Sequence, residues 1–198
     1  MFAIAAVVLW CFPLFHLRSL VAPAEEGAGG AGVAAAADKF WNEQLPSARA
    51  TDVAVVLAAL QKDPKAAIQT YARTVGLGAA YFFVSGEGRV VARERDAVRL
   101  AVGAGADAPV VELQTGPVFG NTVRDGTGLL DVNRFSSLQD FNALAAELNE
   151  RIESRVLPTL RDRAQPGTQV RFTGCAEAVE PTSGQPLLTI VPTHVEIR

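Results

Sequence analysis

The sequence contains few of the residues on which most metal sites and nucleophilic enzymes depend. It has two cysteines and two histidines in 198 residues, and none of them has the spacing of a zinc site. Cys11 lies in an apolar N-terminal run, so Cys175 stands alone in the folded part and forms no intrachain disulfide. A catalytic cysteine needs a base, and His194 is the one histidine in that part. We therefore interpret Cys175 as a small buried residue and expect no metal or other cofactor.

The sequence also lacks an excess of positive charge. It has 18 basic and 21 acidic residues, for a formal net charge of -3. Nucleic-acid-binding proteins normally present a basic face, and anionic lipids attract polybasic segments. The composition therefore argues against both kinds of partner. Hydrophobic residues make up 49% and charged residues 20%, which favours a packed core in one domain, or in a small domain with a helical attachment.

One apolar run opens the chain, from Phe2 to Phe15. It is shorter than the roughly 20 residues of a full membrane span, and Pro13 interrupts it. Such a run is typical of a signal peptide or a short signal anchor, and a buried core helix is the alternative. We predict an anchor over residues 1–20 with the body outside the cytoplasm. Trp10 argues against lipidation of Cys11, since a lipidated cysteine usually follows a small residue.

Two segments of different character follow the anchor. Residues 21–37 are rich in alanine and glycine, and this composition predicts a flexible linker. Residues 38–76 carry apolar residues at helical spacing and predict a helical hairpin. Thr51 is the expected N-cap of one helix, and Asp63 followed by Pro64 is the expected start of the next.

Beyond Gly78 the pattern changes to short apolar bursts, which predict strands. We expect a tight turn at Gly86–Gly88, because glycine favours such turns. The predicted strands lie near residues 80–85, 88–94, 97–102 and 109–114.

A second helical pattern begins after Ser136 or Ser137, with Asp140 in capping-box spacing, and Pro158 should end or kink this helix. Two strands follow, Thr168–Val179 and Leu187–Ile197, with a bulge or close backbone approach expected at Gly174. This order predicts an α+β fold. Residues 77–198 would form an OB-like β-barrel with the long helix inserted between strands three and four, in one compact unit with residues 38–76.

The richest candidate for a site is the stretch GPVFGNTVRDGTGLLDVNRF, residues 116–135. A hydrolase-like enzyme would use Asp125 and Asp131 as an acid–base pair, with Arg124 orienting the substrate. The spacing of oxygen-bearing residues does not match a calcium-binding EF-hand loop. Loops that border such barrels bind ligands, and amides and charged side chains suit hydroxyl-rich or carboxylate ligands. A purely structural role, satisfying the loop backbone, is the third possibility. Among the functional roles we favour non-enzymatic binding, with these candidate residues: Phe119, Asn121, Arg124, Asp125, Asp131, Asn133 and Arg134.

Several phrases also resemble one bacterial family. VFGNTVRDGTGLLDVN, GTQVRFTGCAEAV and LTIVPTHVEIR are similar to the predicted periplasmic lipoproteins of unknown function, domain-of-unknown-function family 2291. The resemblance runs from about residue 7 to the end and carries over no catalytic residue. It implies an OB-like barrel on the periplasmic face of the inner membrane. We associate such families with ABC-type sugar uptake, so the implied partner is a transporter component or a small polar ligand.

Overall fold

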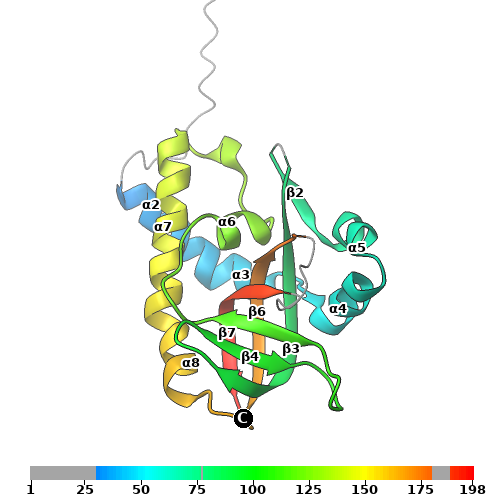
Figure 1. The fold of residues 1–198 in the computed structure, drawn as a ribbon. Helices are drawn as coiled ribbons and strands as arrows, with labels where there is room; N and C mark the ends of the chain where they lie inside the picture. Colours follow the sequence, from blue (N-terminus) through cyan, green and yellow to red (C-terminus); the bar gives the residue numbers. More distant parts are fainter. Residues whose placement is uncertain (1–29, 77, 180–187) are drawn as a thin grey trace, which may run out of the picture.

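The computed structural model describes residues 30–76, 78–179 and 188–198, and its centre is a closed barrel (Figure 1). The barrel strands pair in the order β3-β4-β5-β7-β6, and β6 pairs back to β3. The pair β5–β7 is parallel, while the other neighbours in the barrel are antiparallel. These pairings confirm the predicted α+β fold with a β-barrel. The strands are β3 Ala79–Arg93, β4 Ala97–Ala101, β5 Val110–Gln114, β6 Gln169–Glu177 and β7 Thr189–Ile197.

Strand β3 corrects one prediction, because no turn interrupts it at Gly86–Gly88. It runs for 15 residues and pairs with β6 throughout that region. A Cβ atom on Gly86 would lie 2.4 Å from Cγ1 of Val53, and one on Gly88 would lie 2.8 Å from the carbonyl oxygen of Ala101. Glycine is therefore required here for the close approach of neighbouring elements and not for a turn.

The second half of the barrel follows the sequence pattern closely. The register between β6 and β7 shifts next to Gly174, and a Cβ atom there would lie 2.5 Å from the carbonyl oxygen of Val191. Ser137 caps helix α7, Leu138–Arg155, by accepting a hydrogen bond from the backbone N–H of Asp140. Helix α8, Leu157–Arg163, begins with Pro158 in its first turn. In chain order, both helices lie between β5 and β6.

The hairpin of helices is shorter than predicted, and its first cap differs. It consists of α4, Val53–Lys62, and α5, Pro64–Tyr71. Asp52, not Thr51, caps α4 by accepting from the N–H of Ala54, because the short strand β1, Thr51–Asp52, continues beside β3 up to the residue before α4. Asp63 caps α5 as predicted. Strand β2, Arg73–Val75, then pairs with the start of β3.

The first helix that the structure describes corrects the linker prediction. Helix α2, Gly30–Lys39, continues into a π-helical segment, Phe40–Gln44, and then into α3, Leu45–Ser47. Alanine is the best helix former, and the apolar face of this helix is buried against α7. The prediction of a flexible linker is therefore wrong for residues 30–37. Residues 21–29 and the predicted anchor, residues 1–20, lie outside the described part.

Two hydrophobic cores hold these layers together. The first lies inside the barrel, where Val53 and Leu57 of α4 meet Phe82 and Phe172 of the barrel wall. The second lies outside the wall, where α2, α7 and α8 pack around Cys175. Figure 1 shows α2, α7 and α8 on one side of the barrel and the hairpin α4–α5 on the other. Among the helices in the described ranges, none is both long enough and apolar enough to cross a membrane.

Candidate ligand-binding pocket

The candidate stretch, residues 116–135, connects β5 to α7 across the outside of the barrel wall. It contains a short helix, α6 Thr122–Gly126, and a 3-10 turn, Val132–Arg134. A Cβ atom on Gly126 would lie 3.0 Å from Sγ of Cys175 and 3.3 Å from Cβ of Tyr81. Helix α6 therefore packs directly on the barrel wall, and glycine permits that contact.

Arg124 and Asp125 are bound to each other and to α7. The guanidinium donates from Nε to Oδ1 of Asp125 at 2.7 Å and from Nη2 to Oδ2 at 3.0 Å. Its Nη1 donates to the carbonyl oxygen of Phe141 and to Oδ1 of Asn142. The guanidinium also stacks on the Phe141 ring, 4.0 Å from the centroid. Both charged side chains are less than a tenth exposed, so this pair joins α6 to α7.

Asp131 and Asn133 hold the 3-10 turn. Oδ1 of Asp131 accepts from the backbone N–H of Asn133 at 2.9 Å and from its side-chain Nδ2 at 2.8 Å. This is the local side chain to backbone bonding that stabilises turns. These two side chains therefore have a structural role, since they satisfy the backbone of their own loop.

Phe119 and Asn121 lie elsewhere, along a groove of about 390 Å³ beside α7. Phe119 is 80% exposed. Nδ2 of Asn149 donates to the carbonyl oxygen of Gly120 and fixes this part of the stretch on α7. The seven candidate residues therefore do not form one site. Arg124 and Asp125 form the buried pair, Asp131 and Asn133 hold the turn, Phe119 and Asn121 line this groove, and Arg134 lies at a separate pocket.

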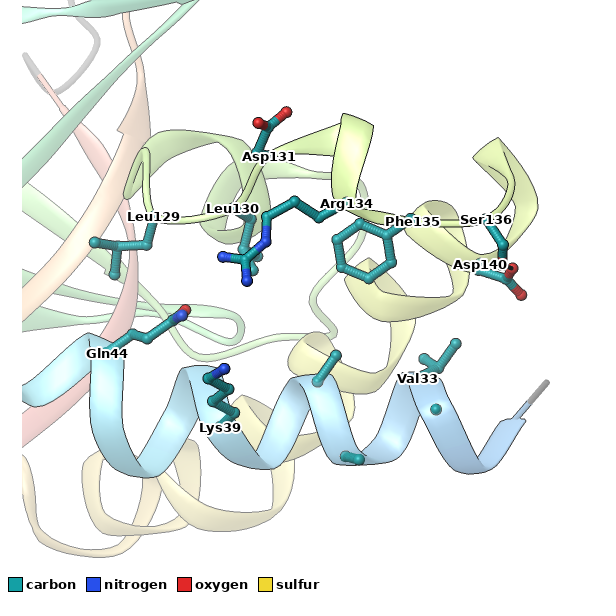
Figure 2. Close-up of a pocket in the computed structure, with 13 residues that line it drawn as sticks. Val33, Lys39, Gln44, Leu129, Leu130, Asp131, Arg134, Phe135, Ser136 and Asp140 are labelled. Atoms are coloured by element: carbon teal, nitrogen blue, oxygen red, sulfur yellow. Dashed lines mark hydrogen bonds between the residues drawn. The ribbon is translucent and has the colours of Figure 1, made fainter. Parts of the chain in front are cut away.

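A pocket of about 200 Å³ lies between α2 and the end of the stretch, at residues 129–136 (Figure 2). Val33 and Ala36 of α2 face Leu129, Leu130 and Phe135, so its walls are largely apolar. The polar residues that line it are Lys39, Gln44, Asp131, Arg134, Ser136 and Asp140.

The amide of Gln44 has an unsatisfied atom at this pocket. Its Oε1 is buried and has no hydrogen-bond partner among the described residues. A buried polar atom without a partner costs about 1–3 kcal/mol, so such atoms are rare and call for an explanation. Gln44 also ends the π-helical segment, and short π-helical segments occur frequently at functional sites.

Two basic side chains point into the pocket, and its two carboxylates bond within their own segments. In Figure 2 the polar ends of Lys39, Gln44 and Arg134 point into the gap between α2 and residues 129–135. The carboxylate of Asp131 points away from α2 and holds its own turn. Oδ2 of Asp140 accepts from the hydroxyls of Ser136 and Ser137, each at 2.8 Å.

The position of α2, one wall of the pocket, is fixed by Arg151 of α7. This residue is 7% exposed, and its Nη1 donates to Oδ1 of Asp38 at 2.7 Å. Its Nε and Nη2 donate to Oε1 of Glu147 on its own helix. The interaction ties α2 to α7 beside the pocket.

Sequence reasoning found one half of this pocket. Arg134 was among the predicted site residues, and Leu129–Ser136 belongs to or directly follows the candidate stretch. No motif marks Lys39 or Gln44, and the alanine-rich tract before them has the composition of a linker, so the sequence does not single them out. The helix-forming strength of that tract was the one usable signal.

Metal-binding and nucleophilic groups are scarce in the part of the chain that the structure describes. It holds no group of three histidine, cysteine or acidic side chains that would suit a metal ion. Burial raises the pKa of the Cys175 thiol far above its usual range, which keeps it protonated and unreactive. Burial and the nearby charge of Asp125 raise the pKa of Tyr81, so it is neutral at physiological pH.

The strand order and the parallel β5–β7 pair define an OB-fold protein with helices outside the barrel. A solved OB-fold protein from Thermotoga maritima MSB8, a crystal structure at 1.90 Å resolution, is similar to it with a TM-score of 0.72. The two share 24% sequence identity over 84% of this chain and 98% of that chain. The chain belongs to the family described as predicted periplasmic lipoprotein (DUF2291), whose model matches residues 3–196. No curated protein matches it.

Family membership confirms the resemblance drawn from the sequence and supports a periplasmic, membrane-attached protein. It assigns no reaction, ligand or transporter to the chain.

Proposed function

We propose that this chain is a non-enzymatic periplasmic binding protein, held at the inner membrane by its N-terminus, whose site is the pocket between α2 and residues 129–136. The observation that carries the proposal is the buried Oε1 of Gln44, which has no hydrogen-bond partner among the described residues and lies at a largely apolar cavity. A concave apolar site with a few convergent polar groups is the usual form of a small-molecule site. A bound ligand supplies the missing hydrogen bond.

The arrangement gives no support to the alternative of a hydrolase-like enzyme. That reading needs Asp125 and Asp131 as acid and base, with Arg124 available to the substrate. Arg124 and Asp125 bond to each other in a buried pair, and Asp131 holds a turn. Only the binding reading remains as a proposal.

The proposed ligand is small. The cavity of about 200 Å³ falls below the roughly 300–1,000 Å³ of sites for drug-sized molecules. It is nearer the ~150 Å³ of a cavity known to hold benzene. A ligand the size of a monosaccharide or smaller suits this volume.

An accessory role in ABC-type sugar uptake is a further part of the proposal and rests on the resemblance to the family. The binding protein would present its small ligand to a transporter component, which is the proposed partner. Cells that lack the protein should then take up the bound compound more slowly, while uptake of compounds that it does not bind should be unchanged.

A thermal-shift screen tests the binding site itself. The full chain, purified in detergent, is melted with sugars, polyols and small organic acids, and unfolding is followed by tryptophan fluorescence. Trp41 lies in the π-helical segment, so it reports on this region. We expect at least one class of compound to raise the melting temperature of the wild-type protein.

A pair of tryptophan substitutions shows whether that compound occupies the pocket. Ala35 is exposed and lines the pocket, so Ala35→Trp should fill its mouth and abolish the shift. Ala58 is exposed on α4, on the other side of the barrel, so Ala58→Trp is the matched control and should keep the shift. Equal shifts in both variants would place binding elsewhere and overturn the proposal.

A further inference from the structure

We infer that the ligand of this pocket is a small hydroxy acid, a molecule with one carboxylate, at least one hydroxyl and a compact carbon body. This inference rests on the proposed function and names the class of molecule that the site selects. Three features of the pocket carry it: its charge, its unpartnered acceptor and its apolar walls.

The charge at the pocket selects an anion. Lys39 and Arg134 are both basic side chains, and both point into the gap in Figure 2. Two carboxylates also line the pocket, but that of Asp131 points away from α2, and that of Asp140 accepts from the hydroxyls of Ser136 and Ser137 just before α7. A ligand carboxylate placed between the ammonium and the guanidinium would form charge-assisted hydrogen bonds, which are about twice as strong as neutral ones.

The unpartnered oxygen of Gln44 selects a donor on the same ligand. An amide oxygen accepts hydrogen bonds, so a hydroxyl or an N–H group must face it. A ligand ammonium would meet this need, but it would lie beside Lys39 and Arg134 and be repelled by them. A hydroxyl meets it without adding positive charge, which favours a hydroxy acid over an amino acid.

The walls select the rest of the molecule. Val33, Leu129, Leu130 and Phe135 offer carbon surface to the ligand, and burial of apolar area there is favourable by roughly 25 cal/mol per Å². Inorganic phosphate or sulfate would leave this surface uncovered. A carboxylic acid with a short carbon chain or a ring covers it.

Matched probes test the class. We would titrate the full chain with mandelate, with phenylacetate, which lacks the hydroxyl, and with mandelamide, which lacks the charge. Lactate, gluconate, glucose, alanine and inorganic phosphate complete the set. We expect at least one hydroxy acid to bind, and to bind roughly tenfold or more tightly than the matched neutral compound.

Two variants separate the two contacts. Lys39→Gln should lower the affinity for the hydroxy acid roughly tenfold and leave the preference for a hydroxyl unchanged. The control Lys62→Gln changes an exposed lysine of α4 and should leave the affinity unchanged. Gln44→Leu should remove the preference for a hydroxyl and leave the preference for an anion. Gln44→Glu keeps the side chain's size but adds a negative charge, so it should abolish binding of the acid.

The outcomes distinguish this inference from the proposed function. If glucose, alanine or phosphate binds as tightly as every hydroxy acid and loses binding in Ala35→Trp, the pocket is a binding site but the inferred class is wrong. If no compound's binding depends on Ala35, both are overturned. Tighter binding of a hydroxy acid, lost in Gln44→Glu and retained in Lys62→Gln, supports both.

Discussion

The guanidinium of Arg124 and the carboxylate of its neighbour Asp125 form a paired, two-bond contact beneath α7, at 2.7 and 3.0 Å. The same guanidinium covers the Phe141 ring and bonds to that residue's carbonyl oxygen. The most conspicuous charged residues of the candidate stretch are thus part of its internal support. The pocket lies at the other end of the stretch, where Arg134 faces α2.

This contact predicts a large stability effect and a small binding effect for Arg124→Ala. The substitution leaves the carboxylate of Asp125 buried without its partner, so the free energy of unfolding should fall by about 3 kcal/mol. Urea unfolding measures this loss. Arg95, whose side chain is 94% exposed, provides the control, and Arg95→Ala should change stability by less than about 0.5 kcal/mol. An unchanged stability in Arg124→Ala would contradict the structural role.

Because Arg151 attaches α2 to α7, Arg151→Met should lower both the stability and the ligand affinity of the protein, unlike Arg124→Ala. The substitution removes the bonds to Asp38 and Glu147, and stability should fall by about 2 kcal/mol. Because α2 forms one wall of the pocket, ligand affinity should fall as well, and proteases should cleave near residues 30–39 sooner. Glu150→Ala, an exposed change on the same helix, should leave cleavage and affinity as they are. If α2 in Arg151→Met resists proteases as well as it does in the wild-type protein, this contact does not hold α2 at the pocket.

Because Cys175 is buried, we expect the stability of the protein to fall at alkaline pH. Burial raises the thiol pKa in the folded state, whereas the unfolded thiol loses its proton near pH 8.5. Above that pH the unfolded state binds fewer protons than the folded state, so stability falls as pH rises, by about 2 kcal/mol at pH 10. Urea unfolding at pH 8 and pH 10, in a Cys11→Ser background, measures the decline.

The control for that experiment is Cys175→Ala. It should lose less stability than the thiol-containing protein between pH 8 and pH 10, by about the same 2 kcal/mol. An identical decline in the two proteins would mean that Cys175 titrates alike in the folded and unfolded states. The folded protein should also resist thiol reagents at neutral pH until it is unfolded.

The N-terminal run predicts the topology of the full chain. A C-terminal phosphatase fusion should be active, because the body is expected in the periplasm, and removal of residues 1–22 should release the protein from the membrane. Cys11→Ser should leave attachment intact, since Trp10 is unsuited to a lipidation site. An inactive fusion would contradict the periplasmic orientation, and release by Cys11→Ser would show that lipid is the anchor.

The barrel was predictable because the sequence changes its hydrophobic spacing where the structure changes element. Ser137, Asp63 and Gly174 each signal a local feature that the structure contains. Gly86 and Gly88 misled because a glycine that avoids a clash inside a strand resembles one that allows a turn. Only the long-range pairing of β3 with β6 distinguishes the two cases.

The site was half predictable for a related reason. Polar residues concentrated in one stretch pointed to residues 116–135, and Arg134 lines the pocket. The helix α2 that closes it lies about a hundred residues earlier in the chain and carries no motif. Lys39 and Gln44 become site residues only because Arg151 and the buried apolar face dock that helix on α7.

The most direct test of the pocket is hydrogen exchange of the full chain, with and without the compound that gives the largest thermal shift. Binding in the pocket should slow amide exchange in two segments that are distant in sequence, residues 30–44 and residues 129–136. The groove beside α7, at residues 118–121, should exchange at the same rate in both samples. Slower exchange at that groove, with residues 30–44 unchanged, would contradict the proposed site.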